Sequence, residues 1–188
     1  MDRRTLLIGA GAAATSACWH PVYSWRQKLT IEVESDGKVY SGSSVIRVEW
    51  NEAYGGRLTG RPFEDRMRGE AAFVDVPGGG TLFALLRSKA SQDYSKQIAF
   101  IAFGYFPKPG ITIESIKSLS HAQGRKATLS PDQFPMLVAF ADVNDPMSVK
   151  EVPPDDLESV FGPGARLKSI SIEITDEQVT SLILTKLP

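Results

Sequence analysis

The chain has 188 residues, a formal net charge of −1, one cysteine and two histidines. Its 21 Lys and Arg residues are balanced by 22 Asp and Glu residues, so it lacks the basic excess that binds nucleic-acid phosphates, and no nucleic-acid partner is expected. A single cysteine excludes an internal disulfide, two histidines exclude a His-rich metal site, and no motif calls for a cofactor.

The first 17 residues have the layout of an export signal. Arg3 and Arg4 precede an apolar run over residues 6–14, and small residues follow it. The apolar run is much shorter than the roughly 20 residues that span a bilayer. The two arginines, followed by one further residue and two leucines, resemble a twin-arginine signal. Export by the twin-arginine route and export by general secretion are both open.

Cys18 follows the small residues 15–17 directly. Its position resembles that of the lipid-attachment cysteine of bacterial lipoproteins. The alternative is an ordinary cleavage site after Ala17 with an unrelated cysteine beside it. Because an unpaired thiol is a liability in an exported protein, we expect lipidation, and with it a periplasmic protein held on a membrane through a lipid on Cys18.

Between the anchor and the domain we expect a tether over residues 18–27. In the tether, Trp19 and Trp25 would lie at the depth of the lipid headgroups, or Trp25 would instead pack against the first strand. Residues 28–188 are expected to form a single domain, since a chain of this length buries a sizeable core.

The first elements of the domain are predicted to be strands. Apolar and polar residues alternate over 29–34 and 45–50, on either side of the tight-turn pair Asp36-Gly37. Residues 51–66 are predicted to form a loop. Strands are predicted over 69–76 and 81–87, joined by a glycine-rich turn at 77–80. A phosphate-binding loop would lead into the N-terminus of a helix, and strand-like residues follow here instead, so we interpret 77–80 as a hairpin turn.

Helices are predicted to alternate with strands in the second half. Residues 111–128 fit either a helix or a strand. The other predicted elements are helices over 91–106 and 153–162, strands over 134–143 and 167–174, and a last helix over 175–187. This order favours an α+β fold, an antiparallel sheet with covering helices; a β-sandwich with short helices is the alternative.

Few side chains in the sequence suggest catalysis or metal binding. Ser43 and Ser44 lack the flanking glycines of a nucleophile elbow, and His121 is the only histidine of the domain, so no catalytic set is expected. Asp142 and Asp145 lack the glycine and glutamate of an EF-hand loop, and Asx turns account for them without a metal.

One basic cluster stands out, and it consists of Arg57, Arg61, Arg66 and Arg68. Because the arginine side chain binds phosphate with two parallel hydrogen bonds, this cluster is a candidate site for an anion or a lipid headgroup. The alternative is a solvated loop with salt bridges to neighbouring acids.

Several segments are similar to an uncharacterised group of exported proteobacterial proteins. They are residues 25–34, 41–45, 69–71, 135–140, 142–146, 155–157, 161–164 and 170–175. The resemblance covers most of the mature chain and implies an exported single domain, but no known activity. We therefore expect an exported, lipid-anchored accessory or binding protein of the cell envelope that could contact another envelope protein; an exported hydrolase is the alternative.

Overall fold

The computed structural model describes residues 22–53, 56–60, 62–77, 80–142 and 144–181, without the side chains of residues 57, 59 and 146. Within these residues, two antiparallel sheets are accompanied by four short α-helices, which confirms the predicted α+β class. The strands are β1 (Tyr23–Ser35), β2 (Lys38–Glu52), β3 (Phe63–Arg68), β4 (Ala72–Val76), β5 (Gly80–Ala84), β6 (Lys126–Thr128), β7 (Leu137–Phe140), β8 (Val149–Glu151) and β9 (Arg166–Thr175). The α-helices are α1 (Gly56–Thr59), α2 (Tyr94–Ala102), α3 (Ile113–Ser120) and α4 (Glu158–Phe161), and two 3-10 turns cover Pro131–Gln133 and Pro146–Ser148.

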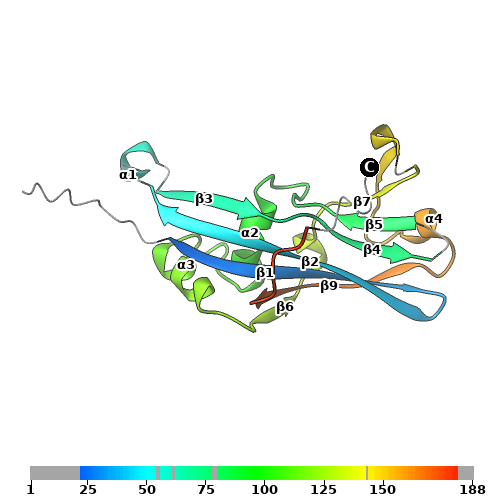
Figure 1. The fold of residues 1–188 in the computed structure, drawn as a ribbon, viewed down its shortest axis with the longest axis horizontal. Helices are drawn as coiled ribbons and strands as arrows, with labels where there is room; N and C mark the ends of the chain where they lie inside the picture. The colour runs from blue at the N-terminus through cyan, green and yellow to red at the C-terminus, as the bar shows by residue number, and fades with distance from the viewer. Residues whose placement is uncertain (1–21, 54–55, 61, 78–79, 143, 182–188) are drawn as a thin grey trace, which may run out of the picture.

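The long hairpin of β1 and β2 is the frame of the molecule (Figure 1). Its turn residues Asp36 and Gly37 have φ angles of 51° and 70°, the left-handed pair of a two-residue hairpin turn. β1 begins at Tyr23, which pairs with Trp50. The predicted tether over residues 18–27 is therefore wrong for residues 23–27, because their backbone is hydrogen-bonded into the sheet. Trp25 is buried, which excludes the position at the lipid headgroups, but it lies within β1 itself and its ring packs against Phe100 instead of against the first strand.

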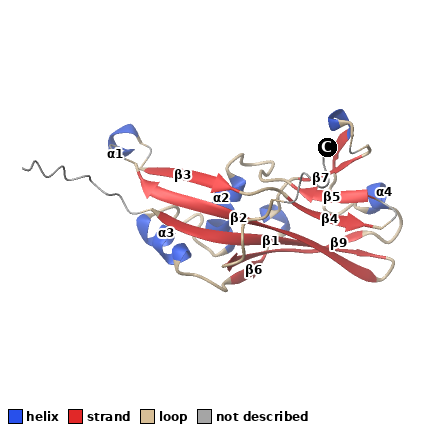
Figure 2. Ribbon diagram, viewed as in Figure 1, coloured by secondary structure: helices blue, strands red, loops and turns tan. Residues whose placement is uncertain are grey.

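The first sheet has the order β3-β2-β1-β9-β6 and the second sheet the order β4-β5-β7-β8. Helices α2 and α3 and the second sheet share one face of the first sheet, which we call its inner face (Figure 2). At the Tyr23 end, the Phe100 ring of α2 meets the Trp25 and Trp50 rings edge-on at centroid distances of 5.6 and 5.5 Å. At the turn end, β4 and β5 cover the same face, so a single core runs along the sheet.

The two sheets approach each other closely where β2 crosses β4 at Gly42. A Cβ atom at Gly42 would lie 1.6 Å from the backbone oxygen of Phe73, so only glycine fits there. Two residues further on, the hydroxyl of Ser44 donates to the backbone oxygen of Glu70 at 2.8 Å. This contact fixes the second sheet on the inner face of the first.

Other predictions needed correction. The loop predicted over residues 51–66 is wrong at residues 51–52, which end β2, at residues 56–59, which form α1, and at residues 63–66, which belong to β3. β3 forms because it pairs with β2 and places Phe63 against Trp50. The ambiguous stretch 111–128 contains both α3 and β6, while the predicted helices over 91–106 and 153–162 are shorter, as α2 and α4.

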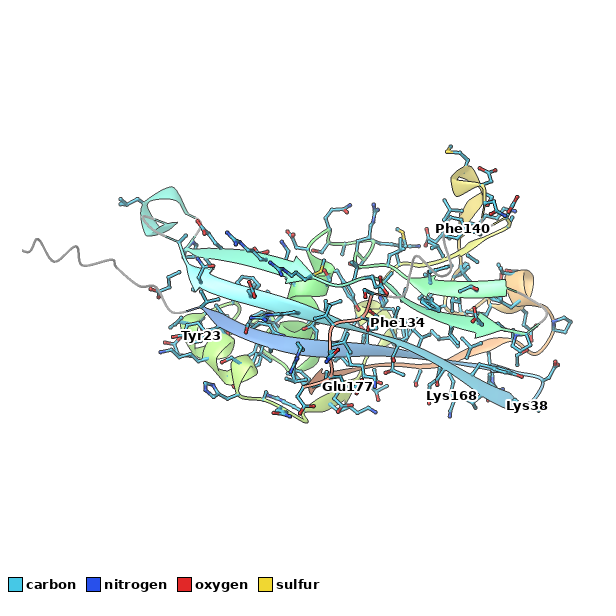
Figure 3. All side chains as sticks on the ribbon, viewed as in Figure 1. Tyr23, Lys38, Phe134, Phe140, Lys168 and Glu177 are labelled. Atoms are coloured by element: carbon cyan, nitrogen blue, oxygen red, sulfur yellow. The ribbon has the colours of Figure 1, made fainter. Side chains whose placement is uncertain are left out.

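The last predicted helix is also wrong over residues 176–181, which are not helical. After β9 the chain crosses the outer face of the first sheet, where Glu177 pairs with Lys28 at 2.7 Å (Figures 1 and 3). Thr180 then exchanges hydrogen bonds with the backbone of Val45 on β2, so long-range pairing takes precedence over the local capping signal at Thr175. Residues 182–188 lie outside the described residues.

Candidate functional site

The main surface feature is a row of three arginines on the outer face of the first sheet. Arg26 on β1 is the register partner of Arg47 on β2, and Arg47 is the register partner of Arg68 on β3. Paired residues on neighbouring strands point to the same side of a sheet, with Cβ atoms about 5 Å apart. We call Arg26, Arg47 and Arg68 the arginine row.

Little neutralises this row. Arg47 makes an ion pair with Glu49 at 2.8 Å and a long hydrogen bond of 3.4 Å to the hydroxyl of Ser24. Among the described residues, neither Arg26 nor Arg68 makes an ion pair. Like charges placed directly opposite each other destabilise a sheet by roughly 0.2–1 kcal/mol per pair, so the row costs the fold free energy.

The structure changes the composition of the predicted basic cluster. Arg66 and Arg68 are exposed on β3, and Arg66 lies on the same face as the row, opposite Glu49. Arg57 belongs to α1, but its side chain lies outside the description, and Arg61 is not among the described residues.

The sequence prediction missed Arg26 and Arg47. Arg26 precedes Asp36 by ten residues and Arg47 follows Gly37 by ten, so the predicted two-residue turn already places them opposite each other.

A polar hollow of about 310 Å³ adjoins the row. Arg26 and Arg47 line it together with Ser24, Gln123 and Asp176. Hydroxyl, amide and guanidinium donors could all serve an anionic group there, while the carboxylate of Asp176 opposes one.

A second, wider groove of about 710 Å³ lies between β3 and the start of α2. Lys96 lies in it, ion-paired with Asp65 and, at 2.7 Å, with Asp93. Partial burial lowers the pKa of Lys96, but the hydrogen bonds and charge attraction of the two carboxylates outweigh burial and raise its pKa above 10.5. Lys96 is thus charged, and its ammonium group is already ion-paired with two carboxylates of the protein.

The small cavity beneath this groove is nearly filled. Its volume is about 20 Å³, room for about one water molecule. Gln27 on its wall accepts a hydrogen bond from the Trp25 indole and donates one to the backbone oxygen of Ser95. Tyr94 donates to the backbone oxygen of Gln133 at 2.8 Å, and burial raises the pKa of Tyr94. These groups hold the core together and offer no binding volume for an organic ligand.

The residues considered for catalysis or metal binding are not brought together. His121 ends α3, where its Nδ1 lies 2.8 Å from the backbone oxygen of Lys117. Asp142 and Asp145 accept from the backbone N–H groups of residues 144 and 147, the Asx turns that the sequence predicted. Figure 1 shows α3 and β7 at opposite ends of the molecule. Within the described residues, no cluster of His, Cys, Asp or Glu could hold a metal ion.

In comparisons with known proteins, no family model, no curated protein and no solved structure matches the chain. Among the described residues, no helix has the length and apolar character needed to cross a membrane. Cys18, Arg3 and Arg4 lie outside the described residues.

Proposed function

We propose that this protein is an exported, lipid-anchored accessory protein of the bacterial cell envelope, a binding protein and not an enzyme. In this proposal, residues 1–17 direct export through Arg3 and Arg4, and Cys18 carries the lipid. The resemblance to exported proteobacterial proteins supports the export step. The arginine row supports a binding role, since two of its three members, Arg26 and Arg68, make no ion pair with a described residue and like charges placed side by side cost stability.

The position of β1 determines which end of the domain a lipid on Cys18 would hold at the membrane. The strand begins at Tyr23, so residues 19–22 alone separate it from Cys18. Fully extended, this segment spans at most roughly 18 Å between Cys18 and Tyr23. Figure 3 shows Tyr23 at one end of the long sheet and Lys38 near the other. A lipid on Cys18 would therefore hold the Tyr23 end of the domain close to the membrane surface.

Metabolic labelling with a fatty acid tests the anchor. We expect the wild-type chain to incorporate the label and to sediment with membranes, and Cys18→Ala to do neither. Ser16→Ala, two residues away, is the matched control and should label like wild type. Equal labelling of wild type and Cys18→Ala would refute the lipid attachment.

Paired lysine substitutions distinguish the two export routes. Arg3→Lys with Arg4→Lys keeps the charge but removes the twin-arginine pair. Retention of the precursor in the cytoplasm would assign the twin-arginine route, and unchanged export would assign general secretion. Cytoplasmic retention of the wild-type chain itself would refute export.

A further inference from the structure

We propose that the arginine row, with Arg66 beside it, is a docking surface for anionic phospholipid headgroups of the membrane that holds Cys18. This inference rests on the proposed lipid anchor and adds a second contact to it. A single acyl chain gives only marginal membrane binding, and a basic patch is a common second contribution. The row would then fix which face of the domain lies against the bilayer.

The row is within reach of the surface. Arg26 is three residues after Tyr23, about 10 Å along the strand. The row runs across the strands, which lie about 4.8 Å apart, so Arg26 and Arg68 are separated by about 10 Å. Because residues 19–22 allow roughly 18 Å between Cys18 and Tyr23, the outer face at this end can lie flat on the surface.

Charge on the outer face is divided between its two halves. Towards the turn end, Glu34 pairs with Arg166 at 2.8 Å and Glu32 with Lys168 at 3.6 Å, so that half is balanced. Towards the Tyr23 end, Arg26, Arg66 and Arg68 make no ion pair with any described residue. These three arginines outnumber the two acids beside them that also make no ion pair with a described residue, Glu64 and Asp176, in the half that the anchor would hold near the membrane.

The side chains around the row fit a headgroup layer better than a protein partner. The neighbouring exposed or half-exposed outward residues are polar or acidic (Ser24, Glu49, Asn51 and Glu64), and the one apolar neighbour on β2, Val45, is buried. Protein interfaces have an apolar or aromatic centre, and the row has none. At the same end of the molecule two apolar side chains are exposed, Val22 just before β1 (59% exposed) and Leu58 in α1 between β2 and β3 (94% exposed), where they could meet the apolar boundary of a bilayer.

Vesicle binding tests the proposal on the full chain. Every sample carries Cys18→Ala, so that no lipid is attached, and keeps residues 1–17, so that their contribution is common to all. The parent is compared with Arg26→Gln/Arg47→Gln/Arg68→Gln. The matched control, Lys38→Gln/Arg87→Gln/Lys150→Gln, removes three exposed cations elsewhere. Flotation is measured with phosphatidylcholine vesicles and with vesicles that also contain about 30% phosphatidylglycerol.

We expect the parent to prefer the anionic vesicles and to lose that preference when NaCl rises from about 0.05 M to about 0.5 M. Each basic residue near an anionic surface strengthens binding about fivefold, so the row variant should bind on the order of 100-fold more weakly than the parent. The control should lose much less. Circular dichroism melting checks that the row variant is folded.

Three results would overturn the proposal: no preference of the parent for anionic vesicles, equal losses in the row variant and the control, or row-dependent binding to polyglutamate but not to vesicles. The last would assign the row to an acidic protein instead. Fatty-acid labelling of Cys18 is a separate readout. Labelling without row-dependent vesicle binding would overturn only this inference, and row-dependent binding without labelling would overturn only the anchor.

Discussion

Replacing Gly42 with alanine tests how the two sheets are packed. The added Cβ would lie 1.6 Å from the backbone oxygen of Phe73, 2.6 Å from its carbonyl carbon and 2.9 Å from the Cα of Val74. All three atoms are backbone, so no side-chain rotation can relieve the clash. The φ angle of Gly42 is not in the left-handed region, so alanine would add no backbone strain there.

The size of the effect follows from these distances. Ordinary van der Waals contact begins at 3.4 Å, so β2 and β4 would have to separate by nearly 2 Å at this crossing. Such a shift would also break the 2.8 Å hydrogen bond from Ser44 to the backbone oxygen of Glu70. Overpacking a core with a methyl group costs about 1–3 kcal/mol, and a rigid backbone neighbour puts this site at or above 3 kcal/mol.

Urea unfolding followed by tryptophan fluorescence measures the free energy of unfolding. Trp25 and Trp50 lie on the inner face of the same sheet and report on the core. Ser43→Ala, at the exposed neighbouring position on β2, is the control and should change stability by less than about 0.5 kcal/mol. A Gly42→Ala chain within 0.5 kcal/mol of wild type, about the scatter expected for a surface change, would refute the close packing of the sheets.

Three further predictions concern backbone conformation, surface charge and pH. Gly162→Val should lower the free energy of unfolding by about 1–3 kcal/mol, because Gly162 has φ 89° and ψ 171°, a region open essentially to glycine alone; an unchanged urea midpoint would contradict this. Arg68→Gln should raise stability by roughly 0.2–1 kcal/mol in low salt by relieving repulsion with Arg47, and a lower melting temperature would count against the arginine row. The folded-state pKa values of Tyr94 and Lys96 are raised above 10.0 and 10.5, so their stabilising contributions are complete below those values and are lost as the pH rises through the folded pKa values. The free energy of unfolding, measured by urea titration at a series of alkaline pH values, should therefore fall as the pH rises. Tyr94→Phe should make this fall less steep, and at neutral pH it should cost about 1 kcal/mol through the lost hydrogen bond to Gln133. A fall of unchanged steepness would argue against the burial of Tyr94.

The sequence by itself determined the central hairpin and the class of fold. Asp36-Gly37 specifies a two-residue turn, and that turn sets the β1-β2 register with no help from distant residues. The same register places Arg26 opposite Arg47, so two of the three arginines of the row could be placed from the sequence. Alternation also identified the buried face of β9, where Ile170, Ile172 and Ile174 enter the core.

Only the tertiary structure decided which segments become edge strands and where one sheet crosses the other. Residues 63–68 are mostly charged, and they form β3 because β2 offers them an open edge and Trp50 a ring for Phe63 to pack on. This pairing brings Arg68 beside Arg47 and completes the row. The segment after Thr175 has helical spacing, yet Thr180 hydrogen-bonds to Val45, 135 residues away in the chain. Turns and alternation depend on neighbouring residues and can be seen in the sequence, whereas an edge strand or a backbone crossing such as Gly42 on Phe73 depends on partners that only folding brings together.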